Sequence, residues 1–248
     1  MDIGDSTLGV VQPGADFPRA AQDWHYLRLL PQLLGEMERP VRLLDLGAGD
    51  GRSFGVARKV LGSDRVEWTG VDISDSTEHL RRPENAPSID EYDGVNLPYA
   101  DGSFDAIWCK QVLEHVRYPD KTLAEVARVL RPSGLFIGSV SQLEPYHSRS
   151  IFNWTHYGIR TVFADHKLEV DELTPGVDGL LLMLRSVFGL DTGLNKFFTQ
   201  ETPFNLVVNA LFENPEKNSQ QNAEIVWRQR LKIAGHIHFL ARRTALTD

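Results

Sequence analysis

The residues with the clearest chemical signature form a short glycine-rich turn. The segment "VRLLDLGAGDGRS", residues 41–53, places three glycines in five positions directly after an apolar run. Asp45 and Asp50 stand on either side of the first two glycines. Glycines let the backbone approach a ligand closely. The turn is therefore a candidate cofactor site, and its acidic residues bear on which cofactor it can hold.

The spacing and charge of this turn do not suit a phosphorylated ligand. The dinucleotide fingerprint has its third glycine three positions after the second, where this chain has Arg52, and no P-loop lysine follows. Two unit charges 4 Å apart interact by about 4 kcal/mol at an effective dielectric constant of about 20. Acids here would repel a polyphosphate. A cationic ligand such as S-adenosylmethionine (SAM), with a sulfonium, an ammonium and no phosphate, turns this repulsion into attraction.

Alternating strand and helix patterns surround the turn. Such alternation implies right-handed crossovers and a parallel sheet with helices on both faces. Ligands of such sheets bind at the carboxyl ends of the strands. The expected strands are 41–46, 65–74, one near 87–92, one from 104, 135–140, 167–173 and 235–243, and the expected helices are 20–38, 52–62, 119–134, 175–189, 203–215 and 222–232.

The chain is predicted to hold one large domain. Residues 1–18, rich in Gly, Asp and Pro, are interpreted as a flexible arm, and 19–248 as a single domain. Within that domain, 41–140 form the core that contains the glycine turn. Residues from about 144 to 230 are expected to supply acceptor-side loops and a helical cap, with 180–230 as an insertion rather than a second domain.

Composition excludes several classes of protein. The chain has 248 residues and a formal net charge of −8, which disfavours a nucleic-acid partner. Cys109 is the single cysteine, so no internal disulfide forms, and neither its neighbours nor the rest of the sequence predicts a metal site. The chain shows no secretory signal or apolar stretch long enough to span a bilayer. We therefore expect a cytoplasmic protein without stable membrane insertion.

Four segments, in order, resemble the class I SAM-dependent methyltransferases, most closely the type 11 methyltransferase domain. Together they cover about 100 residues. They are "LLDLGAGDG" from residue 43, "GVDIS" from residue 70, "DGVNLPYADGSFDAIWCKQVLEHV" from residue 93 and "EVARVLRPSGLFIGS" from residue 125.

The resemblance implies a Rossmann-like fold and a cofactor. The fold would be a doubly wound, mainly parallel seven-stranded sheet with helices on both faces, an antiparallel last strand and a helical insertion before it. The cofactor would be SAM, released as S-adenosylhomocysteine. The resemblance places Asp45, Gly47, Ala48, Gly49 and Gly51 at the turn, where the glycines line the methionine and ribose and Asp45 supports them.

The remaining cofactor contacts also follow from the resemblance. Asp72 would accept hydrogen bonds from both ribose hydroxyls, and Ile73 would pack on the adenine. Asp93, with Gly94 beside it, would accept from the adenine amino group, although Asp90 and Glu91 lie close enough to shift the register. Lys110 and Gln111 would offer backbone contacts to the methionine portion. The alternatives are a helix cap or loop acid for Asp72 and plain core packing for Ile73.

Methyl transfer from a sulfonium is an in-line displacement in which alignment supplies most of the catalysis. A hydroxyl acceptor must also lose a proton, for which histidine is a usual base. The candidates are His115, His147 and His156. His115 lies in a segment that recurs in the family, whereas the other two belong to an aromatic stretch, residues 144–158, placed where an acceptor should arrive.

We therefore predict a SAM-dependent methyltransferase that acts on a small molecule, with a sugar or secondary-metabolite hydroxyl as the favoured acceptor. The alternatives are C- or O-methylation of a lipid or quinone-like acceptor, and a SAM-binding sensor or scaffold without turnover. Several later phenylalanines suggest a lid or apolar acceptor pocket, with core packing or a homodimer interface as alternatives. They are Phe188, Phe197, Phe198, Phe204 and Phe212.

Overall fold

The computed structural model describes residues 25–35, 37–78, 82–189 and 193–245. The predicted arm, residues 1–18, lies outside these ranges. The helix expected from residue 20 is described from His25 as α1 (His25–Leu34), and Pro31 lies inside it. The proline therefore does not divide the helix.

A sheet of seven strands organises the described residues, in the order β3-β2-β1-β4-β5-β7-β6. Its central strands are nearly continuous apolar runs, as expected where helices cover both faces of a sheet. The strands are β1 (Val41–Leu46), β2 (Val66–Ile73), β3 (Ile89–Tyr92), β4 (Phe104–Lys110), β5 (Leu130–Ser141), β6 (Leu168–Pro175) and β7 (His236–Arg243).

Strand directions agree with the predicted Rossmann-like class. Strands β3, β2, β1, β4 and β5 are parallel neighbours, whereas β7 is antiparallel to both β5 and β6. Several boundaries differ from the prediction, and the start of β5 is one of them. Residues 131–134 were expected to end a helix, but β5 already begins at Leu130 and shifts its register against β4 between Phe104 and Ala106.

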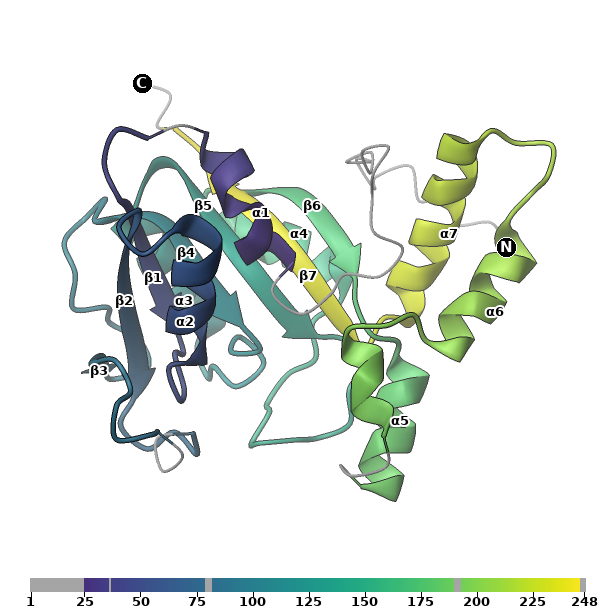
Figure 1. Ribbon diagram of the computed structural model, residues 1–248, viewed down its shortest axis with the longest axis horizontal. Coiled ribbons are helices and arrows are strands. Elements are labelled where there is room, and N and C mark those ends of the chain that lie inside the picture. The colour runs from purple at the N-terminus through teal and green to yellow at the C-terminus, as the bar shows by residue number, and fades with distance from the viewer. Residues whose placement is uncertain (1–24, 36, 79–81, 190–192, 246–248) are drawn as a thin grey trace.

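Helices lie on both faces of the sheet (Figure 1). α1 and α2 (Arg52–Leu61) pack on one face through Tyr26, Leu27, Leu30 and Ala57. The opposite face carries α3 (Pro119–Val129) and α4 (His156–Asp165), and residues of α7 join the same apolar cluster. This covering leaves the carboxyl ends of the parallel strands for the loops that carry the chemistry.

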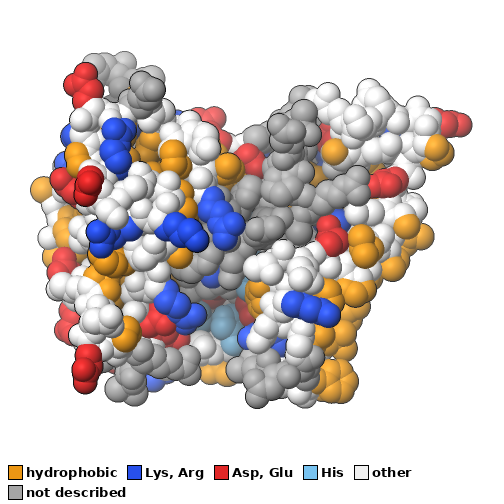
Figure 2. Space-filling model, viewed as in Figure 1, with side chains coloured by type: hydrophobic (Ala, Val, Ile, Leu, Met, Phe, Trp, Pro, Cys, Tyr) orange, Lys and Arg blue, Asp and Glu red, His pale blue; other side chains and the backbone are white. Residues whose placement is uncertain are grey.

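Helices also fill the stretch before the last strand, as predicted. They are α5 (Gly179–Phe188), the short 3-10 helix η2 (Leu194–Phe198), α6 (Pro203–Phe212) and α7 (Ser219–Ile233). Apolar side chains gather over α5 and along the outer side of α6 (Figure 2). The more exposed of them are Met183, Val187, Phe188, Leu206, Val207 and Leu211.

The phenylalanines singled out in the sequence do not form a deep core. Phe197 and Phe198 are half-buried and pack with Leu194 against a small cluster built on Val177, Leu181 and Leu182. Phe188 and Phe212 are exposed. Within the described residues, no helix has both the length and the apolar character needed to cross a membrane.

Candidate active site

The glycine turn joins β1 to α2 at the carboxyl edge of the sheet. Gly47, Gly49 and Gly51 have φ of 74°, 56° and 80°, in the left-handed region that glycine tolerates. A Cβ on Gly47 would also lie 2.4 Å from Cγ2 of Val112, in the loop after β4. Glycine is therefore required at position 47 both by backbone conformation and by the close approach of that loop.

Asp72 stands beside this turn, at the end of the neighbouring strand β2. It is 7% exposed. Its Oδ2 accepts a hydrogen bond of 3.0 Å from the backbone N–H of Gly49, and its Oδ1 accepts one of 2.9 Å from that of Ile73. The carboxylate is thus fixed against the turn, and its binding of a ribose diol stays a prediction.

Arg82 is a site residue that the sequence reasoning missed. Its Nε donates to the carbonyl oxygen of Gly49 over 2.7 Å, and its Nη2 lies 3.5 Å from Oδ2 of Asp72. The guanidinium therefore links the turn to the acid beside it. It lies 33 residues after Gly49, so no local pattern in the sequence indicated it.

The two acids within the turn segment are placed differently from Asp72. Asp45 is buried, its Oδ2 accepts a hydrogen bond from the Ser53 hydroxyl, and burial raises its pKa to about 7. Asp50 is paired with Arg52 at 2.6 Å. Asp72 is therefore the acid at the mouth of the turn, where its charge is paired with Arg82, while Asp45 lies buried beneath the turn.

The predicted adenine side also comes together. Ile73 ends β2, and a Cβ on Gly94 would lie 3.6 Å from its Cγ2. Asp93 is exposed, and its carboxylate accepts hydrogen bonds from the backbone N–H groups of Val95 and Asn96. These bonds lower its pKa. Asp93 thus orders its own loop and keeps lone pairs available for a further donor.

Lys110 and Gln111 lie where β4 ends. Gln111 has φ of 54°, a left-handed conformation that turns the chain out of the strand. Its backbone N–H donates to the carbonyl oxygen of Ser139, and its side-chain Oε1 accepts from the hydroxyl of Ser141 over 2.9 Å. This geometry orients the following loop over the edge of the sheet.

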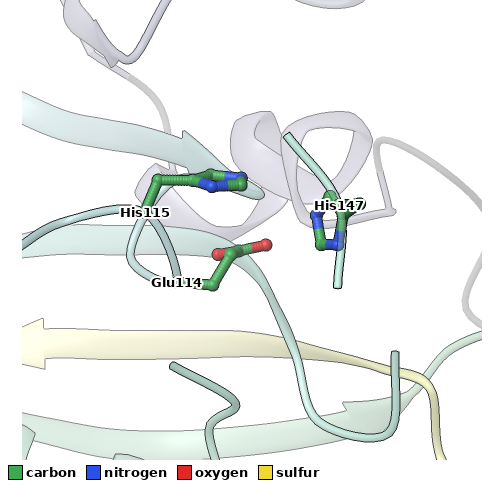
Figure 3. Close-up of side chains that lie close together, drawn as sticks. All are labelled: Glu114, His115 and His147. Atoms are coloured by element: carbon green, nitrogen blue, oxygen red, sulfur yellow. The ribbon is translucent and has the colours of Figure 1, made fainter. Parts of the chain in front are cut away.

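That loop brings Glu114 and His115 next to His147, which follows β5 (Figure 3). One potential ligand atom from each of the three side chains lies within 4.8 Å of the other two. The rings of His115 and His147 meet edge to face, with 5.2 Å between their centroids. Two of the three predicted catalytic histidines are therefore neighbours, together with the buried carboxylate of Glu114.

Polar groups support this cluster from beneath. The hydroxyl of Ser141 lies 3.0 Å from Oε1 of Glu114 and 2.6 Å from Oε2 of Glu144. Burial raises the pKa of Glu114 to about 6. Glu144 has a pKa of about 2, because its hydrogen bond with His236, 2.8 Å long, and the positive field of that ring outweigh its burial.

His156, the third predicted base, does not belong to this cluster. It begins α4, and its backbone N–H donates to Oε1 of Gln142 over 3.2 Å.

Figure 2 shows histidine surface in a recess near the lower middle of the face, with acidic side chains close by. The site therefore has a cofactor side built on β1 and β2 and a histidine-lined side built on the loops after β4 and β5.

The fold and this site define a Rossmann-like protein with a glycine turn and a buried acid, Asp72, at the carboxyl edge of its sheet. Comparison with known proteins narrows the class. Residues 44–138 match the family model of the methyltransferase domain, type 11. These residues are the strands and loops that carry the glycine turn, Asp72 and the end of β4.

Individual relatives match the same region. Methyltransferase GfsG of Streptomyces halstedii is 36% identical over 98 residues, which are 38% of this chain and 35% of that protein. The 27-O-demethylrifamycin SV methyltransferase of Amycolatopsis mediterranei is 37% identical over 102 residues, 38% of this chain and 36% of that protein. The chain thus spans about a third of the length of these curated relatives.

Among solved structures, geranyl diphosphate methyltransferase in complex with SAM superposes with a TM-score of 0.54 at 17% sequence identity. The match covers 88% of this chain and 84% of that one. Residues 44–138 are therefore similar in sequence to methyltransferase domains, and the described residues share the fold of a methyltransferase that was solved with SAM. The left-handed glycine turn and the buried carboxylate beside it fit SAM.

Proposed function

We propose that this protein transfers the methyl group of SAM to a small-molecule acceptor, with a hydroxyl of a sugar or secondary metabolite as the favoured acceptor. The observation that carries the proposal is that two sets of polar residues lie at the same edge of the sheet. Asp72 and the glycine turn can hold a nucleoside, and Glu114, His115 and His147 lie across the next loops.

The chain's own residues would bind the cofactor, align the acceptor with it and remove the acceptor's proton. The bound cofactor supplies an electrophilic methyl group on a sulfonium. Asp72 offers oxygen acceptors to a diol, and the backbone around Gly47 and Gly49 allows close approach. The cluster of Glu114, His115 and His147 is placed to receive an acceptor hydroxyl and to assist the loss of its proton.

The cofactor side is tested by calorimetry with SAM, S-adenosylhomocysteine, ATP and NADH. We expect wild-type protein to bind the first two. Asp72→Asn should weaken SAM binding by about 10- to 100-fold, the effect of about 1.5–3 kcal/mol that a charged hydrogen-bond acceptor contributes. Asp75→Asn is the matched control, because this exposed acid pairs with Arg149. Uptake of ATP or NADH without SAM would refute the proposal.

The acceptor side is tested with His147→Ala. Labelled SAM and a cell extract, followed by mass spectrometry, identify the product that gains a methyl group. We expect turnover on that acceptor to fall by about 100-fold or more, while calorimetry gives an unchanged SAM affinity. His166→Gln, which removes a histidine paired with Asp120, serves as the control. Unchanged turnover would remove His147 from the mechanism.

A second candidate is C- or O-methylation of a lipid or quinone-like acceptor. It is favoured by the exposed apolar side chains of α5 and α6, which include Val187 at 77% and Leu211 at 70% exposure. A SAM-binding sensor without turnover is the candidate of another class. The extract experiment separates them, because a sensor binds SAM and yields no methylated product.

A further inference from the structure

We propose that Glu114, His115 and His147 form a binding site for one divalent transition-metal ion. The three side chains come from two loops that meet above β4 and β5, and one potential ligand atom of each lies within 4.8 Å of the others (Figure 3). Bonds of about 2.0–2.2 Å to a single cation hold such atoms about 3–4 Å apart. A small inward movement of these side chains completes the shell.

Unsatisfied polar atoms point to a ligand at this place. Glu114 has no exposed surface, yet its Oε2 has no hydrogen-bond partner among the described residues. The Nδ1 of His115 is likewise buried without a partner in that part of the chain. A buried carboxylate oxygen and a buried ring nitrogen each lose free energy when left unpaired. A shared cation satisfies both.

Hydrogen bonds around the three side chains orient them so that one atom of each remains available to a metal ion. Nδ1 of His147 lies 3.1 Å from the carbonyl oxygen of Pro145, which makes Nδ1 the protonated nitrogen and leaves the Nε2 lone pair for a metal. Oε1 of Glu114 lies 3.0 Å from the Ser141 hydroxyl, whereas Oε2 has no hydrogen-bond partner among the described residues and is available to the ion. Second partners of this kind orient metal ligands and fix the histidine tautomer.

The donor set selects the metal class. Two imidazoles and one carboxylate suit borderline ions such as Zn²⁺ or Co²⁺, whereas Mg²⁺ and Ca²⁺ prefer oxygen ligands throughout. Three protein ligands leave at least one coordination position open. The role in catalysis rests on the proposed function: the ion would bind an acceptor oxygen and favour its deprotonated form, with His147 as a ligand rather than a free base.

Metal binding is tested without any methyl acceptor. Protein stripped with EDTA is titrated with Co²⁺, followed by visible absorption, and separately loaded with Zn²⁺, desalted and assayed for metal. We expect one ion per chain in the wild type and in the control His166→Gln. Glu114→Gln and His147→Ala should each weaken metal binding by at least about 100-fold. Loss of a group that only hydrogen-bonds to a metal ligand costs up to about 100-fold, and loss of a ligand should cost at least as much.

Thermal unfolding and SAM calorimetry on the same variants show whether they are folded. Sub-stoichiometric uptake by the wild type, equal uptake by folded variants, or retention of Mg²⁺ alone would overturn the assignment. If SAM fails to bind while Co²⁺ binds with the expected mutational pattern, the proposed function fails and the metal site stands.

Discussion

Two aspartates near the glycine turn have opposite environments and different tasks. Asp72 accepts hydrogen bonds from two backbone N–H groups at the mouth of the turn. Asp45 is buried beneath it, beside Ser53, whose hydroxyl also accepts from the indole N–H of Trp68. The acids of the turn were expected to face the ligand. Asp45 is buried instead, Asp50 pairs with Arg52, and Asp72 at the mouth of the turn pairs with Arg82.

Asp45 should make stability depend on pH. Its folded-state pKa of about 7 is above the usual value of 3.8, so the folded protein binds the proton more tightly than the unfolded chain. The contribution of the protonated carboxyl is present below about pH 4 and is lost as pH rises to 7. We expect Asp45→Asn to remove this contribution to the pH dependence of the free energy of unfolding.

The measurement is urea unfolding of both proteins between pH 4 and 8. One pKa unit corresponds to about 1.4 kcal/mol, so the difference in the free energy of unfolding should change by a few kcal/mol at most across this range. Parallel curves for wild type and Asp45→Asn would contradict the prediction.

At the scale of elements, Asp105 ties three strands together at the edge opposite the site. This carboxylate, with no exposed surface, accepts hydrogen bonds of 2.7 Å from both terminal nitrogens of Arg39 and one of 2.8 Å from Nε of Arg131. It also accepts from the backbone N–H of Arg42 in β1. These groups hold its pKa at about 2. The starts of β1, β4 and β5 are thereby fixed in register.

Asp105→Asn should destabilise the fold by about 2–4 kcal/mol, because a buried charged acceptor with several donors is lost. The wild-type contribution is present above about pH 4 and declines as pH falls toward 2. Chemical unfolding at pH 7 checks the magnitude. Asp101→Asn is the control, because Asp101 is 80% exposed in its pair with Arg128. Equal effects of the two substitutions would contradict the prediction.

Structural features that lie in one local segment could be predicted from the sequence. The glycine turn, the helix that follows it and the acid at the end of β2 are each indicated by a pattern within about a dozen residues. Their positions at the edge of the sheet follow from the alternation of strands and helices. The grouping of Glu114 with His147 could not be found in this way. These residues are 33 positions apart and meet because β4 and β5 are parallel neighbours whose loops emerge at one edge.

The last strand is buried on both faces. Ile237, Phe239 and Ala241 alternate with His236, His238 and Leu240, as expected of a strand. The whole stretch from His236 to Ala241 is buried, because β7 lies between β5 and β6 with packing on both faces. The polar members are accommodated by partners such as Glu144, which pairs with His236.

At the scale of the molecule, the exposed apolar side chains of α5 and α6 form an apolar surface that differs from the polar surface elsewhere. We expect the double variant Val187→Ser, Leu211→Ser to bind less of an apolar fluorescent dye than the wild type. Both side chains are largely exposed, so the free energy of unfolding should change by less than about 0.5 kcal/mol per site.

Dye fluorescence and urea unfolding check the two parts of this prediction, and SAM calorimetry shows that the cofactor side is intact. Equal dye binding by the two proteins would mean that this surface does not attract apolar molecules. The same variant helps to choose between acceptor classes, because it should raise the KM for a lipid-like acceptor and leave that for a sugar unchanged.

The position of β7 has a consequence for how the chain is assembled. This strand comes last among the described elements, yet it separates β5 from β6, and β6 hydrogen-bonds to no other strand there. During synthesis on the ribosome, β6 must wait until residues 236–243 have emerged before it can join the sheet. Its backbone donors and acceptors are unpaired in that interval, when the nascent protein is most open to mispairing or chaperone capture.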